Sequence, residues 1–541
     1  MSTLSLSCKR VMTMLSRRPL FILALAAGGG VAVFLLYAVA VGAPAGFPLD
    51  DAWIHQTYAR NLVQHGDLVY YPGLRSVGST SPLYTLLLSV AYAIGLPYRV
   101  WTVFLGWLAL TGIGWGSWRL AMRLFPGRPR LALAAGLLCC SEWHMVWAAL
   151  SGMETALFCA LGLILFGDGI TLADFLSAGR RERLFDAFMK PLRLGLLAGL
   201  LVLTRPEGLL LFGLVGLNLW VAGAQSARRK ADGQRVSLLI KRLALASAGL
   251  TVGCLLLLIP YGAFNFATSG WLFPNTFYAK QMEYRSMIEG APLWRRWLRL
   301  LASIFVGPQA LLVPGMVWAG LLGLRDGARR WAGQSGAAHS GALPFLYALS
   351  FTLVYAIRLP VTYQHGRYLM PVIPLWIVMG LGGTLSWLGE IRASAARRLA
   401  SRSVAAVLLA AAITFLFLGA GAYVGDIEFI EGEMVTVARW LDAHTPPDAL
   451  IAVHDIGVIG YFTRRPLLDL AGLITPEVIP IIRDGPALLQ FMQERGARYL
   501  VTFPSWYPSL AASPALEMVY QTDCPHTRAA GLDNMAVYRL R

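Results

Sequence analysis

Two adjacent acidic residues, Asp50 and Asp51, follow the first hydrophobic stretch of the chain, in the run FPLDDAWIHQTYARNLVQHGDLVYYPG. A carboxylate can act as a general base that takes a proton from an attacking hydroxyl group. His55 follows Asp51 by four residues, which places both on one face of a helix. Asp is also favoured at a helix N-cap, where the helix dipole stabilises its charge. The run therefore predicts either a reactive site or a capped helix.

Other polar side chains occur near the ends of apolar segments. Ionisable residues close to membrane depth are costly, so they indicate a functional cavity. Arg and Lys can bind a phosphate and stabilise the charge that grows on a phosphate leaving group. Besides the catalytic candidates Asp50 and Asp51, we predict these substrate-binding residues: His55, Tyr58, Glu154, Arg205, Tyr278, Lys280, His365, Arg367, His454 and Asp455.

Each of these candidates also has a structural explanation. Glu154 in LSGMETAL can cap a helix, and Arg205 in TRPEG can pair locally with Glu207. Lys280 and Arg367 can bind anionic lipid head groups. The histidine of the first loop can be a structural partner of the neighbouring aspartate, and the HD pair of AVHDIGVIGY can equally serve a turn or packing.

The composition of the chain predicts a membrane protein. Of its 541 residues 57% are hydrophobic and 14% are charged, and the mean hydropathy is +0.58. Soluble domains carry about 25% charged residues, whereas apolar stretches of the roughly 20 residues needed to cross a bilayer recur along most of this chain. The net charge of +17 is explained by Lys and Arg in the short loops on one side, as the positive-inside rule expects. No nucleic-acid partner is therefore expected.

Alternation of apolar segments and basic loops predicts about 11 transmembrane helices. The first, near 20–41, lacks a clear cleavage site and follows a basic tail, so we expect a retained anchor and a cytoplasmic N-terminus. Ser81–Leu96 is short and predicts an interfacial helix. The predicted spans lie near 20–41, 98–123, 131–150, 154–170, on either side of 204–207 (two short spans), and near 243–264, 297–323, 343–358, 370–388 and 403–424.

The pattern changes after Gly425. Residues 426–541 contain no span and alternate between helix and strand patterns, which predicts a small α/β extracytoplasmic domain. Residues 1–425 would form the transmembrane catalytic domain, with an external loop at 44–97. The fold class is therefore mainly α, a polytopic helical protein of the cell (inner or plasma) membrane whose candidate residues lie on the outer side.

The order of several short motifs is more specific than any one of them. These are LDDAWIHQTYARNLVQHGDLVYYPG, GSTSPLYTLLL, LSGMETALF, TRPEG, PNTFYAK, HGRYLMPVIP and HDIGVIGYF…PLLDLAGL. The whole layout resembles the GT-C superfamily of integral-membrane glycosyltransferases, which use polyprenyl-phosphate sugars on the outer face. Over about residues 47–480 the motifs resemble the family that contains the terminal arabinofuranosyltransferase of mycobacterial cell walls. By this resemblance Asp50 and Asp51 match the acidic catalytic pair, and the cations match candidate phosphate ligands.

The resemblance implies transfer of a sugar, arabinofuranose first, from a polyprenyl-phosphate donor to a cell-envelope glycan or glycolipid in the lipid bilayer. A hexose or mannose transferase is the alternative, because relatives with this layout can move different sugars. A lipid-linked sugar transporter or flippase would also need many spans, yet we see no internal repeat of the kind typical of transporters. No cofactor is certain. Two adjacent carboxylates can hold a divalent cation, although no further ligand cluster at suitable spacing accompanies them.

Overall fold

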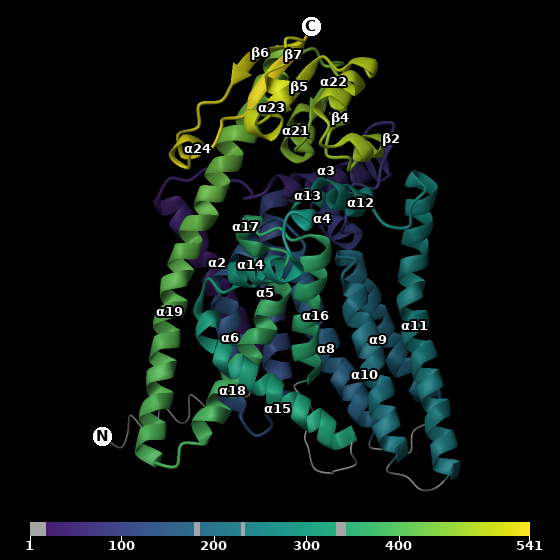
Figure 1. The fold of residues 1–541 in the computed structure, drawn as a ribbon, viewed down its shortest axis with the longest axis vertical. Helices are drawn as coiled ribbons and strands as arrows, with labels where there is room; N and C mark the ends of the chain where they lie inside the picture. Colours follow the sequence, from purple (N-terminus) through teal and green to yellow (C-terminus); the bar gives the residue numbers. More distant parts are fainter. Residues whose placement is uncertain (1–17, 178–183, 229–232, 332–341) are drawn as a thin grey trace.

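The computed structural model describes residues 18–177, 184–228, 233–331 and 342–541. Long helices stand side by side through most of the molecule, and a smaller region of strands and short helices covers one end (Figure 1). This architecture confirms the predicted fold class, a mainly helical, multi-pass membrane protein with a small sheet region at the C-terminus. Several basic residues of the N-terminal tail and of the loops predicted to lie inside are outside the described ranges: Lys9, Arg10, Arg17, Arg180, Arg181, Arg183, Arg229 and Lys230.

Eight helices in the described ranges are long and apolar enough to cross a membrane, or ten if two bent pairs each count as one span. The eight are α2 (Pro19–Ala40), α5 (Tyr98–Leu124), α8 (Thr155–Ser177), α9 (Leu184–Thr204), α10 (Gly208–Arg228), α11 (Gly233–Ser269), the segment Tyr363–Gly389 that includes α17 (Tyr363–Gly366) and α18 (Ile373–Gly389), and α19 (Ser394–Phe429) with its continuation. The prediction of about 11 spans exceeds these ten by α16 (Ala342–Arg358), an apolar helix of 17 residues. The predicted interfacial segment forms α4 (Pro82–Ile94), a helix of 13 residues.

The two bent pairs correct the predicted spans 131–150 and 297–323. The first consists of α6 (Pro129–Ser141) and α7 (Trp143–Leu150), which meet at 52°. Glu142 lies between them and accepts a hydrogen bond from the backbone N–H of Met145, which caps α7. The second is α14 (Leu293–Ile304) and the helical segment Pro308–Arg329, which meet at 114°. The proline favours this break because it has no N–H to donate to the preceding turn.

Close helix pairs hold the membrane part together through small residues. The segment Pro308–Arg329 contains α15 (Val313–Trp331), which packs along α18. Gly383 of α18 lies so close to α15 that a Cβ atom there would be 1.8 Å from the backbone oxygen of Gly315. Glycines at such contacts allow two helix backbones to approach in a membrane.

A five-stranded sheet forms the C-terminal region, in the order β4-β3-β5-β7-β6. The strands are β3 (Ile451–Val453), β4 (Leu467–Asp469), β5 (Tyr499–Thr502), β6 (Leu516–Gln521) and β7 (Ala536–Leu540). β3 runs parallel to β4 and β5, with Ile451 opposite Leu467 and Tyr499, whereas β7 is antiparallel to β5 and β6. The sequence PALLQFMQERG predicts a helix, and α22 (Gly485–Glu494) forms there, between β4 and β5. The sequence ALIAVHDIGVIGYF predicts a short strand with a turn. Only its first part is the strand β3, because Ile456–Thr463 forms the helix α21.

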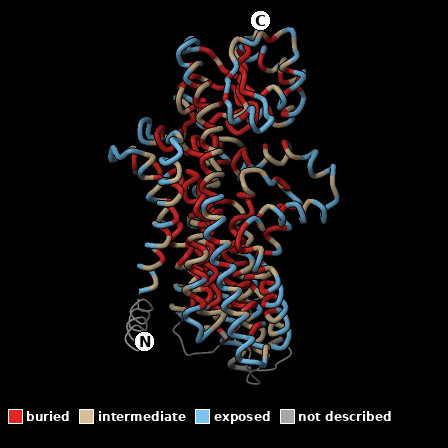
Figure 2. Tube along the Cα trace, turned by 90° about the vertical axis from the view of Figure 1, so that its left-hand side faces the viewer, coloured by how far each residue is buried: buried red, intermediate tan, exposed pale blue. Residues whose placement is uncertain are grey.

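The helical region shares a hydrophobic core with part of the sheet region, which also has a smaller core of its own. A single cluster of buried residues includes Trp53 in α3 (Asp50–His65), Val146 in α7 and Val501 in β5. Buried residues run continuously between the two regions (Figure 2). α19 passes the predicted domain boundary at Gly425 without interruption and continues through a π-helical turn, η3 (Ile430–Val435), into α20 (Thr436–His444). The boundary at 425/426 therefore stays a prediction.

The substitution Gly383→Ala is expected to destabilise the protein, because its Cβ atom would force α15 and α18 apart. Overpacking of this kind costs about 1–3 kcal/mol. The control is Gly389→Ala in the same helix, where no atom lies within 4 Å of the added Cβ. Thermal unfolding in detergent should give a lower melting temperature for the first variant only. Equal melting temperatures would contradict the close contact.

Candidate active site

Two cavities meet where the helical and sheet regions join. Cavity A has a volume of about 360 Å³ and cavity B about 810 Å³. They share the lining residues Asp51, Ile54, Lys280, Arg367 and Leu473. Cavity A is otherwise lined by polar residues that include His55, Ser79, Thr80, Glu154, Arg205 and Thr276, and by apolar residues that include Leu209, Leu210, Phe273, Phe277, Val354 and Leu359. Cavity B is otherwise lined by residues that include Glu283, His365, Asp426, His454, Asp455, Arg483, Trp506 and Tyr507.

Asp51 lies at the junction of the two cavities and is held by two cations. Arg367 Nη2 donates a hydrogen bond to Asp51 Oδ2, and Lys280 Nζ is 3.7 Å from the same oxygen. Lys280 lies in α12 (Asn275–Glu283) and also donates to the hydroxyl of Tyr368, at 2.8 Å. Burial alone would raise the pKa of Asp51, but Lys280 and Arg367 outweigh it and hold the pKa well below its ordinary value. Asp51 is therefore ionised in this arrangement.

Asp50 faces away from this pair and caps α21. Its two carboxylate oxygens accept hydrogen bonds from the backbone N–H groups of Gly457 and Val458, at 2.8 and 2.7 Å. Burial and the nearby Asp455 raise the pKa of Asp50, while the two amide bonds act in the opposite direction. Because both oxygens are engaged, Asp50 has a positioning role. It explains why the Ile- and Gly-containing segment 456–463 is a helix, since the first N–H groups of a helix need acceptors.

The contact between α3 and α21 requires a glycine. A Cβ atom at Gly457 would lie 2.0 Å from the backbone oxygen of Asp50. The absence of a side chain at Gly457 lets the first turn of α3 lie directly against the first turn of α21. The two aspartates thus divide their roles. Both line cavity B, but the Asp50 carboxylate binds amides of α21, whereas Asp51 also lines cavity A and contacts the two cations.

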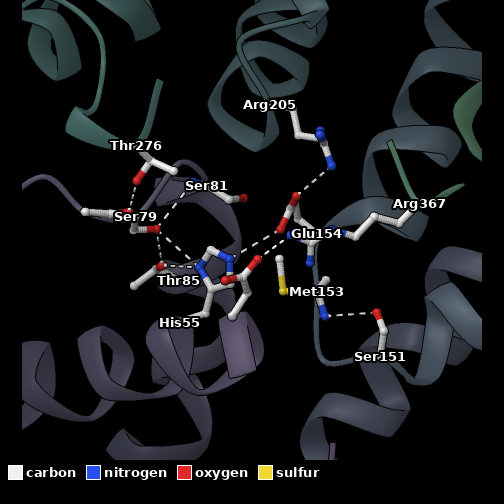
Figure 3. Close-up of polar contacts among 12 residues, drawn as sticks. His55, Ser79, Ser81, Thr85, Ser151, Met153, Glu154, Arg205, Thr276 and Arg367 are labelled. Carbon is white, nitrogen blue, oxygen red and sulfur yellow. Dashed lines mark hydrogen bonds and ion pairs between the residues drawn. The ribbon is translucent and has the colours of Figure 1, made fainter. Parts of the chain in front are cut away.

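A buried network on the other side of the site joins α3 to the spans (Figure 3). His55 Nε2 is 3.3 Å from Glu154 Oε2, and Arg205 Nη1 donates to Glu154 Oε1 at 3.2 Å. Burial would raise the pKa of Glu154, but His55 and Arg205 lower it to about 2. Arg205 also contacts Glu207 at 3.4 Å and Tyr355 at 2.9 Å. Its guanidinium is therefore largely engaged by protein groups.

Arg367 follows a strained turn. Gln364, His365 and Gly366 have φ of 55°, 58° and 68°, and the first two are in a region that residues with a Cβ atom rarely adopt. His365 Nε2 lies 2.7 Å from Asp426 Oδ2 in α19, and its ring is edge-on to Trp147 at 5.2 Å. Strain of this kind persists only where the surroundings hold the backbone in place. We conclude that His365 anchors the turn that presents Arg367.

A second polar cluster lies in cavity B between α12 and the sheet region. His454 Nδ1 is 2.8 Å from the Tyr507 hydroxyl, and its Nε2 is 3.5 Å from Glu283 Oε1. Arg483 contacts Glu283 at 3.4 Å. The neighbouring Asp455 has a buried Oδ2 without a hydrogen-bond partner among the described residues. Burial raises the pKa of Asp455 to about 6, with Asp51 and Glu283 adding to the effect and His454 opposing it.

Two predicted residues lie away from both cavities. Tyr58 is 1% exposed, and its hydroxyl bonds Ser76 at 2.7 Å and the N–H of Gly78 at 3.0 Å. Tyr278 packs against Trp271, with ring centroids 4.6 Å apart. Neither lines cavity A or cavity B, so both have packing roles around the site. The other predicted residues line one of the cavities, some through positions in the sheet region.

Several residues of the site were not among the predicted ones, and Glu283, Asp426 and Tyr355 are examples. Glu283 lies three residues after Lys280, so the i, i+3 spacing on a helix was an available signal. Asp426 is the first acidic residue after a long apolar run, and an ionisable group at that place was an available signal. Tyr355 stands in the apolar helix α16, where it is one of four residues with a hydroxyl group and nothing in the sequence distinguishes it from the others.

The acidic pair does not form a metal site. Asp50 uses both oxygens on backbone amides, and Asp51 is paired with Arg367. In the described ranges no group of three or more His, Cys, Asp or Glu side chains is arranged to hold a metal ion. The residues present therefore do not fit the divalent cation considered from the sequence.

Comparison with solved structures identifies the architecture. ArnT from Cupriavidus metallidurans bound to undecaprenyl phosphate matches with a TM-score of 0.52 and 14% identity, covering 95% of this chain and 97% of that chain. This chain has the GT-C fold. Archaeal oligosaccharyltransferase AglB from Archaeoglobus fulgidus, in complex with an inhibitory peptide and a dolichol-phosphate, matches the same fold with a TM-score of 0.52 and 11% identity, covering 91% of this chain and 70% of that chain. The predicted resemblance to GT-C proteins is confirmed at the level of fold.

Sequence comparisons add little about the chemistry of this GT-C chain. Residues 425–538 match a family described as a domain of unknown function, DUF8728. A search of the curated proteins found no match. Arabinofuranosyltransferase AftD from Mycobacteria aligns with a TM-score of 0.47 and 16% identity, over 96% of this chain and 41% of that chain. That similarity is too low to support an argument about the sugar.

Asp50→Asn is expected to destabilise the protein by about 1–3 kcal/mol, because an amide offers one acceptor oxygen to two backbone N–H groups. Hydrogen exchange in α21 should increase, as measured by mass spectrometry. Asp448→Asn is the control, since its carboxylate is 72% exposed and makes a surface ion pair. Unchanged exchange in α21 would show that Asp50 does not cap it.

Asp455→Asn is expected to stabilise the protein at neutral pH. The raised pKa means that the folded state disfavours ionised Asp455, so this cost is absent below about pH 4 and fully present above about pH 6. The variant should gain up to about 3 kcal/mol at pH 7 and almost nothing at pH 4. Melting temperatures at both pH values test this, and a gain of equal size at pH 4 would contradict it.

Proposed function

We propose that this GT-C chain is a membrane glycosyltransferase that moves a sugar from a polyprenyl-phosphate donor to a cell-envelope glycan or glycolipid. The observation that carries the proposal is the place of Asp51. This carboxylate lies beside Lys280 and Arg367, where an apolar cavity meets a polar one. Transfer from a lipid carrier to a polar acceptor needs one base that borders both an apolar site for the lipid and a polar site for the acceptor.

Cavity A suits the donor. Its apolar residues can contact the polyprenyl chain, and Lys280 and Arg367 can bind the phosphate. Arg367 Nε and Nη1 are buried and have no hydrogen-bond partner among the described residues, so they are available to phosphate oxygens. Arg205 is engaged by Glu154, Glu207 and Tyr355, and we assign it a positioning role. ArnT bound to undecaprenyl phosphate and AglB with dolichol-phosphate support a lipid phosphate as the donor.

The polar residues of cavity A suit the sugar of the donor. Ser79, Thr80 and Thr276 carry hydroxyl groups and line the same cavity as Asp51. His55 Nδ1 lies 3.2 Å from Ser79 Oγ, so a histidine that also contacts Glu154 orders this group. Hydroxyl and imidazole groups can exchange hydrogen bonds with sugar hydroxyls.

In the proposed reaction Asp51 takes a proton from an acceptor hydroxyl that enters through cavity B. The hydroxyl oxygen forms a bond to the anomeric carbon, while the bond between that carbon and the phosphate oxygen breaks. The lipid phosphate leaves with the electron pair, and Lys280 and Arg367 stabilise its charge. Asp50 holds the first turn of α3 and so orients Asp51. His454 and Asp455 would bind the acceptor.

We propose arabinofuranose as the sugar because the ordered motifs resemble the arabinofuranosyltransferase family. A hexose or mannose is the alternative, and the proposed step is the same for each. We further propose that the sheet region and both cavities lie outside the cell and the N-terminus inside. Basic residues at the opposite end of the helices (Figure 1) support this orientation through the positive-inside rule: Arg392 in the loop between α18 and α19, and Arg397 and Arg398 near the start of α19.

Asp51→Asn is expected to lower the rate of sugar transfer by about 10²- to 10⁴-fold, because an amide cannot take the proton. The assay uses purified protein in nanodiscs with polyprenyl-phosphate arabinose and an acceptor oligosaccharide. The control is Asp67→Asn, whose carboxylate pairs with Arg75 away from the cavities and which should keep full activity. Full transfer by the Asp51 variant would sink its assignment as base. Lipid flipping in liposomes without transfer would favour the transporter.

A further inference from the structure

We propose that Asp51 and the donor phosphate compete for the same two cations, so that phosphate binding releases the Asp51 carboxylate for its role as base. This inference rests on the proposed function and adds to it the order in which the two substrates bind. The donor would bind first, and only then would the acceptor hydroxyl meet a carboxylate able to take its proton.

The contacts of Asp51 carry the first step. Arg367 and Lys280 both approach one oxygen, Oδ2. The side chain of Arg367 is 3% exposed and that of Asp51 is 28% exposed. Arg367 is enclosed by its surroundings and held by the turn before it, whereas Asp51 borders open space in both cavities. Asp51 is therefore the partner that can move when another anion arrives.

The unused donors of Arg367 carry the second step. The carboxylate engages Nη2, which also donates to the Tyr368 hydroxyl at 3.1 Å. Nε and Nη1 are buried and have no hydrogen-bond partner among the described residues. An unsatisfied buried donor is costly, and a phosphate can accept from two nitrogens of a guanidinium at once. The site thus contains an Arg that Asp51 satisfies only in part.

The charges at the junction carry the third step. Lys280 and Arg367 together with Asp51 have a net charge of +1, and a donor phosphodiester of charge −1 makes the group neutral. Both anions can be present only if they share the cations. Three neighbouring groups interact with the charge of Asp51. His55 lowers the pKa of Asp51, and Asp51 in turn raises the pKa of Asp50 and of Asp455. Once the cations turn to the phosphate, the pKa of Asp51 moves back toward its ordinary value, which makes it a stronger base.

The test is the affinity for farnesyl phosphate, a short lipid phosphate, measured by calorimetry on the full-length protein in detergent. Asp51→Asn removes the competing anion and is expected to bind farnesyl phosphate about tenfold more tightly than the unmodified protein. Arg367→Gln is expected to bind at least tenfold more weakly. The control is Asp67→Asn, which also removes one carboxylate but lies in neither cavity and pairs with Arg75, and it should change the affinity less than threefold.

Equal or weaker binding by folded Asp51→Asn would overturn the competition and leave the proposed donor site intact. Binding that Arg367→Gln does not change, or no binding to any form, would overturn the donor site and the competition together. Asp51→Ser is a second neutral variant in case Asp51→Asn does not fold. Asp51→Glu keeps a competing carboxylate, and its affinity should stay within threefold of the unmodified protein. A tenfold gain for Asp51→Glu would also overturn the competition.

Discussion

The hydrogen bonds between the Asp50 carboxylate and the first amides of α21 connect the two halves of the molecule. Asp50 follows the first span, and its carboxylate caps a helix of the sheet region that lies about 400 residues later in the chain. Gly457 permits the approach, and a shared hydrophobic core surrounds it. The position of Asp51 depends on this contact, because Asp51 is the next residue in the first turn of α3.

Burial of so many charges is possible because nearly every one has a partner of opposite sign. Glu154 lies between His55 and Arg205, and Asp51 lies between Lys280 and Arg367. A buried charge without a partner would cost several kcal/mol. The exceptions among the described residues are buried polar atoms beside the cavities, such as Arg367 Nε and Nη1 and Asp455 Oδ2. In the proposed function, a substrate would supply their missing hydrogen-bond partners.

Much of the membrane part was predictable because hydropathy reports directly on what a bilayer requires of a helix. The order of spans followed from it, and the break at Glu142 did not, because one acidic residue in an apolar run can cap a helix or simply face a cavity. The site was partly predictable from the acidic pair and the separated cations. Which aspartate faces the cavities depends on α21, and its sequence IGVIGYFT has β-branched and glycine residues that favour a strand or turn over a helix.

The continuous helix from Ser394 to His444 fixes the sheet region relative to the helical region. Its 51 residues have a length of roughly 75 Å at the usual rise per residue, more than twice the thickness of a bilayer core. The helical region and the sheet region are therefore joined by one continuous helical element. In the proposed function, this connection would fix the height at which an acceptor has to present its hydroxyl group.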